Sequence, residues 1–156
     1  MKRLEGKVAI VTASNKGIGY ACVKRLAEEG ATVYMAARRI DVVKEKCKEL
    51  CDQGLNVKPI YWDAEVKERN TAMVDEVAEA EGRLDILVNN YGHSDIRVDK
   101  DIHSTNYADF EELLNYNIAS VFMTSQAAIK HMAKCGGGSI INISSVSGAE
   151  HYKSNM

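Results

Sequence analysis

Short apolar runs alternate with helix-like segments along this chain of 156 residues. The run 7–12 is β-branched and shows no polar alternation, which is typical of a strand buried on both faces of a parallel sheet. Pro59, the single proline, cannot donate to a strand ladder, so the strand that contains it should lie at a sheet edge. The further runs that predict strands cover residues 31–36, 57–62, 84–88 and 139–144.

Between these runs, apolar residues recur at helical spacing. In the first helix they lie four residues apart from Ile18 to Leu26, and Gly30 marks its stop. Asp41 is placed to cap a second helix. Longer helices are predicted over residues 65–81 and 109–134, with a polar loop at roughly 92–108.

This alternation implies right-handed crossovers and an open parallel sheet with helices on both faces, so the fold class is α/β. We expect a doubly wound sheet of the Rossmann type in the strand order 3-2-1-4-5. We predict a single dinucleotide-binding domain over residues 1–156 that is C-terminally incomplete, because the chain stops just after the fifth strand. A missing partner helix should leave an apolar face of the helix 109–134 uncovered.

Composition and charge narrow the function classes. The chain is 46% apolar and 27% charged with a net charge of −2, which excludes disordered and collagen-like proteins. Without clustered Lys and Arg there is no electrostatic basis for binding nucleic acid or an anionic membrane. No apolar run approaches the ~18 residues that span a bilayer. Glu5 and Lys7 interrupt the apolar region that a signal peptide needs, so we expect a cytoplasmic protein.

The four cysteines follow no disulfide framework. Cys47 and Cys51 are four residues apart and could begin a metal site on one helix face. No other His or Cys pair completes a tetrahedral set, so reduced thiols are favoured and no metal site is predicted.

The turn from Thr12 to Gly19, after the first strand, is suited to binding phosphate. Its glycines let backbone N–H groups approach a diphosphate, and the N-terminus of the following helix carries partial positive charge. A tight turn alone would also explain the glycines, but the position after a buried strand favours a nucleotide. The predicted contacts come from Ser14, Lys16, Gly17, Ile18 and Gly19.

This turn resembles the T-G-x-x-x-G-x-G motif of the short-chain dehydrogenase/reductase family, with Ala13 in place of the first glycine. Three segments also resemble the hydroxysteroid dehydrogenase branch of that family, whose members oxidise a bile-acid 7α-hydroxyl: M-K-R-L-E-G-K-V-A-I-V-T, A-E-A-E-G-R-L-D-I-L-V-N-N-Y-G and G-G-G-S-I-I-N-I-S-S. The other motifs that fall in family order are Asp63, Asn89-Asn90-Tyr91-Gly92 in place of N-N-A-G, Asn117 and Ser144-Ser145.

The resemblance implies a role for each motif. Asp63 would contact the adenine amino group, and the turn from Asn90 to Gly92 would lie against the cofactor. Asn117 would hold a water of the proton relay, and Ser145 would orient the substrate oxygen. Alternatives stay open, because Asp63 could cap the following helix and Tyr91 could be simple core packing. An amide in mid-helix competes with the backbone, so Asn117 also predicts a local kink or a held water.

The end of the second strand bears on the choice of cofactor. An acidic residue there would hold the 2′-hydroxyl of NAD and repel the 2′-phosphate of NADP, but this chain has Ala37 followed by Arg38 and Arg39. Lys16 adds a cation in the phosphate turn, so NADP is favoured over the alternative of surface cations without a ligand.

The family's catalytic tyrosine and the lysine four residues after it are not matched. Tyr152 is followed at that position by Met156, and on a helix Lys153 would point away from the face of Tyr152. We expect an oxidoreductase that moves hydride between NADP(H) and a steroid-like secondary alcohol or ketone, homo-oligomeric in its full-length form. The chain as written is expected to be inactive, and the alternative is a non-catalytic NADP-binding module or truncated product.

Overall fold

The computed structural model describes residues 2–94, 97 and 101–146, in which five parallel strands form one sheet. The strand order is β3-β2-β1-β4-β5, which confirms the predicted Rossmann-type α/β topology. The register places Ile10 of the central strand between Tyr34 and Leu87 of its two neighbours. The strands are β1 (Val8–Thr12), β2 (Thr32–Ala37), β3 (Val57–Tyr61), β4 (Ile86–Asn89) and β5 (Ser139–Asn142).

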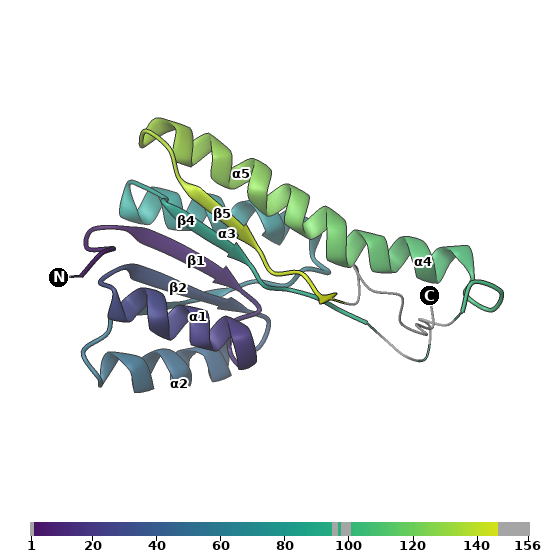
Figure 1. Cartoon of the computed structure of the whole chain (residues 1–156), viewed down its shortest axis with the longest axis horizontal. Coiled ribbons are helices and arrows are strands. Elements are labelled where there is room, and N and C mark those ends of the chain that lie inside the picture. The colour runs from purple at the N-terminus through teal and green to yellow at the C-terminus, as the bar shows by residue number, and fades with distance from the viewer. Residues whose placement is uncertain (1, 95–96, 98–100, 147–156) are drawn as a thin grey trace.

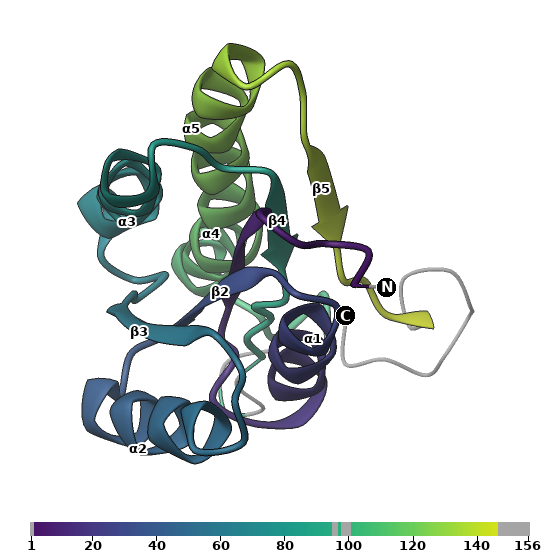
Figure 2. The same cartoon turned by 90° about the vertical axis from the view of Figure 1, so that its left-hand side faces the viewer.

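Helices cover both faces of this sheet, as Figures 1 and 2 show. One face carries α1 (Gly17–Glu28) and α2 (Ile40–Cys51), and the other carries α3 (Lys67–Glu81) and α5 (Ser120–Lys134). Every residue of β1 is buried, because this strand has neighbours on both edges and helices on both faces. Pro59 lies in β3, which pairs only with β2 among the described strands, so the predicted edge position is confirmed.

Several element boundaries differ from the sequence prediction because side chains bind nearby backbone groups. The prediction that Asp41 caps the second helix is wrong, since α2 begins at Ile40 and Asp41 lies in its first turn. The last long helix begins earlier than expected, with α4 (Tyr107–Leu114), because Asn106 Oδ1 accepts a bond of 2.9 Å from the Asp109 N–H. Helix α3 begins later, at Lys67, after a turn in which Asp63 Oδ1 accepts from the Glu65 N–H at 3.1 Å.

Helices α4 and α5 are joined by a π-helical segment, η1 (Asn115–Ala119), that contains Asn117. The predicted irregularity at Asn117 is therefore confirmed. Together the three segments form a long rod that extends past the carboxyl ends of the strands (Figure 1). The apolar side chains that this rod exposes confirm the expected uncovered face, and they are Tyr107, Phe110, Leu114, Ile118, Phe122 and Ile129.

The cysteines in the described residues are free thiols, as predicted. Burial raises the pKa of the Cys47 thiol to about 12, so this side chain behaves as a packed apolar group. Within the described residues, no helix is both long and apolar enough to cross a membrane.

Candidate cofactor and substrate site

The turn between β1 and α1 is held by a buried serine. Ser14 Oγ donates to the Val11 carbonyl at 2.7 Å and accepts from the Ala36 N–H at 3.2 Å, so it fastens the turn to β2. Ala13, where the family has glycine, adopts a positive φ of 50°. The turn leads into α1, whose N-cap residue Lys16 makes no side-chain cap bond. The first amides of α1 are thus not capped by this side chain and can meet an anion.

Helix α1 approaches the turn after β4 closely at Gly19. A Cβ at this position would lie 2.5 Å from Asn90 Nδ2 and 2.7 Å from the Ser14 Cα, so a larger residue does not fit. Asn90 Nδ2 donates to the Thr12 and Ala13 carbonyls at 3.2 and 3.1 Å, and the Asn90 N–H donates to Thr12 Oγ1 at 3.0 Å. These bonds lock the phosphate turn to the carboxyl end of β4.

A cleft of about 490 Å³ opens beside this turn, at the carboxyl ends of β1 and β2. Its lining includes the cations Lys16, Arg38 and Arg39 and the carboxylates Asp63 and Glu65. Ala37, at the end of β2, also lines the cleft and brings no acid to it. The cleft is therefore large enough for one half of a dinucleotide, and its lining has more positive than negative side chains.

Aromatic rings form one wall of this cleft. Tyr91 meets Trp62 edge-on, with ring centroids 5.4 Å apart and planes at 80°, and Trp62 Nε1 donates to Asn70 Oδ1 at 3.1 Å. Burial, with the nearby carboxylates Glu65 and Asp63, raises the pKa of Tyr91 to about 12. Tyr91 is therefore a neutral, partly buried wall of the cleft and not only core packing.

A second cleft of about 600 Å³ meets the first at Tyr91 and Gly92. Ser145 lines it after the end of β5, and Asn117 lines it from η1. Its remaining walls are largely apolar and include Ile18, Ile118, Val121 and Ile143. The two clefts therefore lie next to each other, the first with a charged lining and the second with a largely apolar one.

Asn117 fastens the segment after β4 to η1. Its Oδ1 accepts from the His93 N–H at 2.7 Å, and its Nδ2 donates to the carbonyls of His93 and Leu113 at 2.8 and 3.0 Å. Both amide protons are thus used, and Oδ1 retains one lone pair for a further donor. In this geometry the side chain fixes the backbone next to Gly92.

Comparison with known proteins identifies this arrangement. The profile of the short chain dehydrogenase family matches residues 7–156. The chain belongs to the short-chain dehydrogenase family.

Two relatives of this short-chain dehydrogenase are hydroxysteroid enzymes. It is 50% identical over 146 residues to a 7α-hydroxysteroid dehydrogenase of Clostridium sardiniense, and the match covers 94% of this chain and 56% of the relative. A solved 7α-hydroxysteroid dehydrogenase in complex with NADH and 7-oxo glycochenodeoxycholic acid has a TM-score of 0.89 and 30% identity, over 99% of this chain and 58% of the other. The chain thus spans little more than half the length of these relatives.

A third relative carries the other cofactor. The structure of a metagenomic short-chain oxidoreductase in complex with NADP has a TM-score of 0.87 and 29% identity, over 96% of this chain and 67% of the other. Similar structures therefore hold NADH in one case and NADP in another.

The predicted site residues of this short-chain dehydrogenase separate into three groups: those that shape the turn, those that line the first cleft and those that line the second. Tyr152, which the sequence does not match to the family's catalytic tyrosine, lies outside the described residues, as do Lys153 and Met156. Ser14, Gly17 and Gly19 line neither cleft and shape the turn beside them. The first cleft brings together Lys16, Arg38, Arg39, Asp63 and Gly92, and the second brings together Ile18, Asn90, Gly92, Asn117 and Ser145.

Sequence reasoning missed two residues of this dehydrogenase site and assigned no role to a third, Asn89. Glu65 and Trp62 line the first cleft, and their places beside Asp63 in the sequence were the available signal. Asn89 joins β4 to β5 and α5, because its Nδ2 donates to Asn142 Oδ1 at 2.9 Å and its Oδ1 accepts from Thr124 Oγ1 at 2.9 Å. This buried amide steadies the strand that leads to Ser145.

Proposed function

We propose that the protein is an NADP-dependent oxidoreductase that transfers hydride between NADP(H) and a secondary alcohol or ketone. The observation that carries the proposal is the charged cleft, in which Lys16, Arg38 and Arg39 surround the end of β2 where Ala37 stands in place of an acid. A phosphate monoester carries close to two negative charges at neutral pH, and planar guanidinium groups bind such an anion well.

The backbone around the cleft supports binding of the rest of the dinucleotide. Gly17, Ile18 and Gly19 begin α1 without a side-chain cap on its amides, which suits a diphosphate. The close approach of Gly19 to Asn90 leaves no room for a Cβ, as expected where a helix packs tightly behind a phosphate turn. We propose that Asp63 meets the adenine amino group and that the Asn90 to Gly92 turn lies against the cofactor.

When bound, NADP(H) would supply or accept the hydride. The chain's own residues would position the substrate, with Ser145 orienting the substrate oxygen in the second cleft. We assign Asn117 chiefly to positioning, since its bonds to His93 hold the backbone beside the junction of the two clefts.

For the substrate we propose a bile acid carrying a 7α-hydroxyl or 7-oxo group. The support is the 50% identity to a clostridial 7α-hydroxysteroid dehydrogenase and the apolar walls of the second cleft, which suit a sterol skeleton. A full-length protein that reduces acyl-linked ketones but ignores 7-oxo bile acids would contradict this assignment. We further propose that the protein is cytoplasmic, as its sequence led us to expect. We also propose that it assembles as a homo-oligomer, because the rod of α4, η1 and α5 exposes an apolar face.

The second candidate is a cofactor-binding module without turnover. It is favoured by one feature of the sequence, namely that Met156 stands where a catalytic lysine would follow Tyr152. We propose that a polypeptide of residues 1–156 binds cofactor but reduces no ketone. Activity of that polypeptide that disappears in Tyr152→Phe would contradict this and make Tyr152 the acid–base group.

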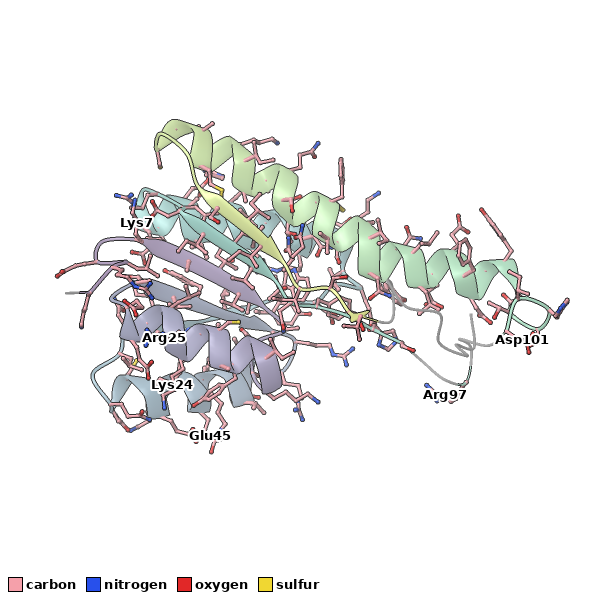
Figure 3. The ribbon with its side chains drawn as sticks, in the orientation of Figure 1. Lys7, Lys24, Arg25, Glu45, Arg97 and Asp101 are labelled. Atoms are coloured by element: carbon pink, nitrogen blue, oxygen red, sulfur yellow. The ribbon has the colours of Figure 1, made fainter. Side chains whose placement is uncertain are left out.

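The cofactor assignment is tested by titrating NADPH and NADH against the fluorescence of Trp62, the single tryptophan, which lines the cleft. NADPH should bind more tightly, and Arg38→Ala should weaken NADPH by about 1–3 kcal/mol while leaving NADH nearly unchanged. Lys24→Ala is the control, because Lys24 points outward from α1 and lines neither cleft (Figure 3). Equal affinity for the two cofactors would overturn the NADP assignment.

A further inference from the structure

Arg38, one of the three cations that line the charged cleft, already has a carboxylate partner inside it. Arg38 Nη1 donates to Glu65 Oε1 at 3.0 Å, and both side chains line the charged cleft. Arg38 follows β2 and Glu65 follows β3, so the pair spans the carboxyl ends of two neighbouring strands. A phosphate that binds Arg38 therefore arrives where a negative charge is already in place.

We propose that Glu65 is a specificity-determining residue, which competes with the 2′-phosphate for Arg38 and so reduces the discrimination of this site in favour of NADPH. The inference rests on the proposed function, because it takes the cleft to hold the adenosine half of a nicotinamide dinucleotide. The Glu65 carboxylate and the 2′-phosphate are two anions that would compete for the same guanidinium group. NADH presents a neutral hydroxyl at the same place and does not meet this repulsion.

Local geometry keeps Glu65 close to the cleft. Its backbone N–H donates to Asp63 Oδ1 at 3.1 Å, which holds the main chain in the turn before α3. The electrostatic influence of Glu65 also reaches Tyr91 in the lining of the same cleft, where it helps to raise the tyrosine pKa. The carboxylate can rotate away from Arg38, but its backbone anchor keeps it near any anion bound there.

Exposure sets the size of the effect. The side chains of Arg38 and Glu65 are 65% and 40% exposed, so solvent screens their interaction and its repulsion of a phosphate. Removing the carboxylate charge should therefore change NADPH affinity by about 3- to 10-fold, and not by several orders of magnitude. Lys16 and Arg39 would continue to contact the phosphate in either case.

The test compares Glu65→Gln with the parent chain in titrations of NADPH and NADH that follow Trp62 fluorescence. Glu65→Gln keeps the side-chain shape and should bind NADPH about 3- to 10-fold more tightly, with NADH changed by less than about 2-fold. Glu68→Gln is the matched control, because Glu68 lies in the first turn of α3, is exposed and lines neither cleft. It should leave both affinities unchanged.

Arg38→Gln and the double variant complete a mutant cycle. In the Arg38→Gln background, Glu65→Gln should lose most of its effect on NADPH, because the competition needs the guanidinium. Unchanged or weaker NADPH binding in Glu65→Gln overturns the inference, and so does a parallel change for both cofactors. If Arg38→Gln binds NADPH as tightly as the parent chain, the NADP assignment itself fails; if it weakens NADPH while Glu65→Gln is neutral, only the competition is wrong.

Discussion

Asp85 is the only Asp or Glu that is buried among the described residues, and its neutralisation should destabilise the fold. The side chain is 6% exposed and accepts bonds from the Val8 N–H at 2.9 Å, from Lys7 Nζ at 3.1 Å and from Arg83 Nε and Nη2 at 2.8 and 2.6 Å. Burial opposes ionisation, but the bonds from Arg83, Val8 and Lys7 outweigh it and hold the pKa of Asp85 well below its usual range.

In Asp85→Asn the amide oxygen can still accept a hydrogen bond from one donor. The negative charge that interacts with Lys7, Arg83 and the Val8 N–H is lost. Hydrogen bonds to a charged group contribute roughly 1.5–3 kcal/mol each and are not additive, and Lys7 and Arg83 keep partial access to water. We expect a loss of about 3 kcal/mol, which corresponds to a fall in Tm of about 6–12 °C for a chain of this length. Asp52→Asn is the control, because Asp52 is 64% exposed and pairs only with Lys48 in the described residues, so it should change stability by less than about 0.5 kcal/mol.

Urea unfolding followed by circular dichroism at several pH values tests the electrostatic reasoning. Because the folded pKa of Asp85 is depressed, its stabilisation is fully present above the unfolded pKa of about 3.9 and is lost as pH falls towards the folded value. The difference between wild type and Asp85→Asn should be constant from pH 8 to about pH 5 and shrink below about pH 4. A difference under about 1 kcal/mol at pH 7, or one that grows on acidification, would refute the argument.

Three further changes test the turn and the exposed rod. Gly19→Ala should lower the free energy of unfolding in urea by about 1–3 kcal/mol and weaken NADPH binding, because its Cβ would lie 2.5 Å from Asn90 Nδ2. Gly92→Ala is the control: no atom lies within 4 Å of the added Cβ, so the stability should hardly change. Ala13→Gly should stabilise the chain by about 0.5–1 kcal/mol in the same assay, since the positive φ of 50° costs alanine more than glycine loses in unfolded-state entropy, and a loss of stability would contradict this. Phe122→Asp in the chain of residues 1–156 should shift sedimentation towards the monomer, because the exposed ring would become a buried charge in an assembly; an unchanged sedimentation coefficient would exclude this face as the contact.

Sheet order and helix placement could be predicted from the sequence because they follow from burial. The β-branched run in β1 is buried along its whole length, and the lone proline in β3 marks the sheet edge. Element ends were less predictable, because they depend on single bonds between side chain and backbone. Asn106 caps α4 and Asp63 delays α3, while Asp41 makes no cap bond although its residue type suits one.

For the site, the sequence identified several residues that line the clefts, but it missed Trp62 and Glu65 and did not show how the lining residues contact one another. Lys16, Arg38 and Arg39 follow from their places after strands, since the carboxyl ends of parallel strands meet at one edge of the sheet. The ion pair between Arg38 and Glu65 joins residues 27 positions apart, and the contact of Gly19 with Asn90 joins two separate turns. Such contacts are set by tertiary packing, and spacing along the chain carries no signal for them.

Residues that stabilise the fold and residues of the proposed binding site lie at opposite ends of the strands. Lys7, Arg83 and Asp85 form their ionic cluster where β1 and β4 begin, and Figure 3 shows Lys7 at the end of the sheet opposite to the carboxyl ends of the strands. The positive φ of Ala13 and the two clefts lie at the carboxyl ends, where we propose that the cofactor binds. Because these groups share no contacts, Asp85→Asn should lower stability without changing the ratio of NADPH to NADH affinity, and Glu65→Gln should change that ratio without lowering stability. If either variant changed both the stability and the ratio of the two affinities, the two ends of the strands would be coupled through the sheet.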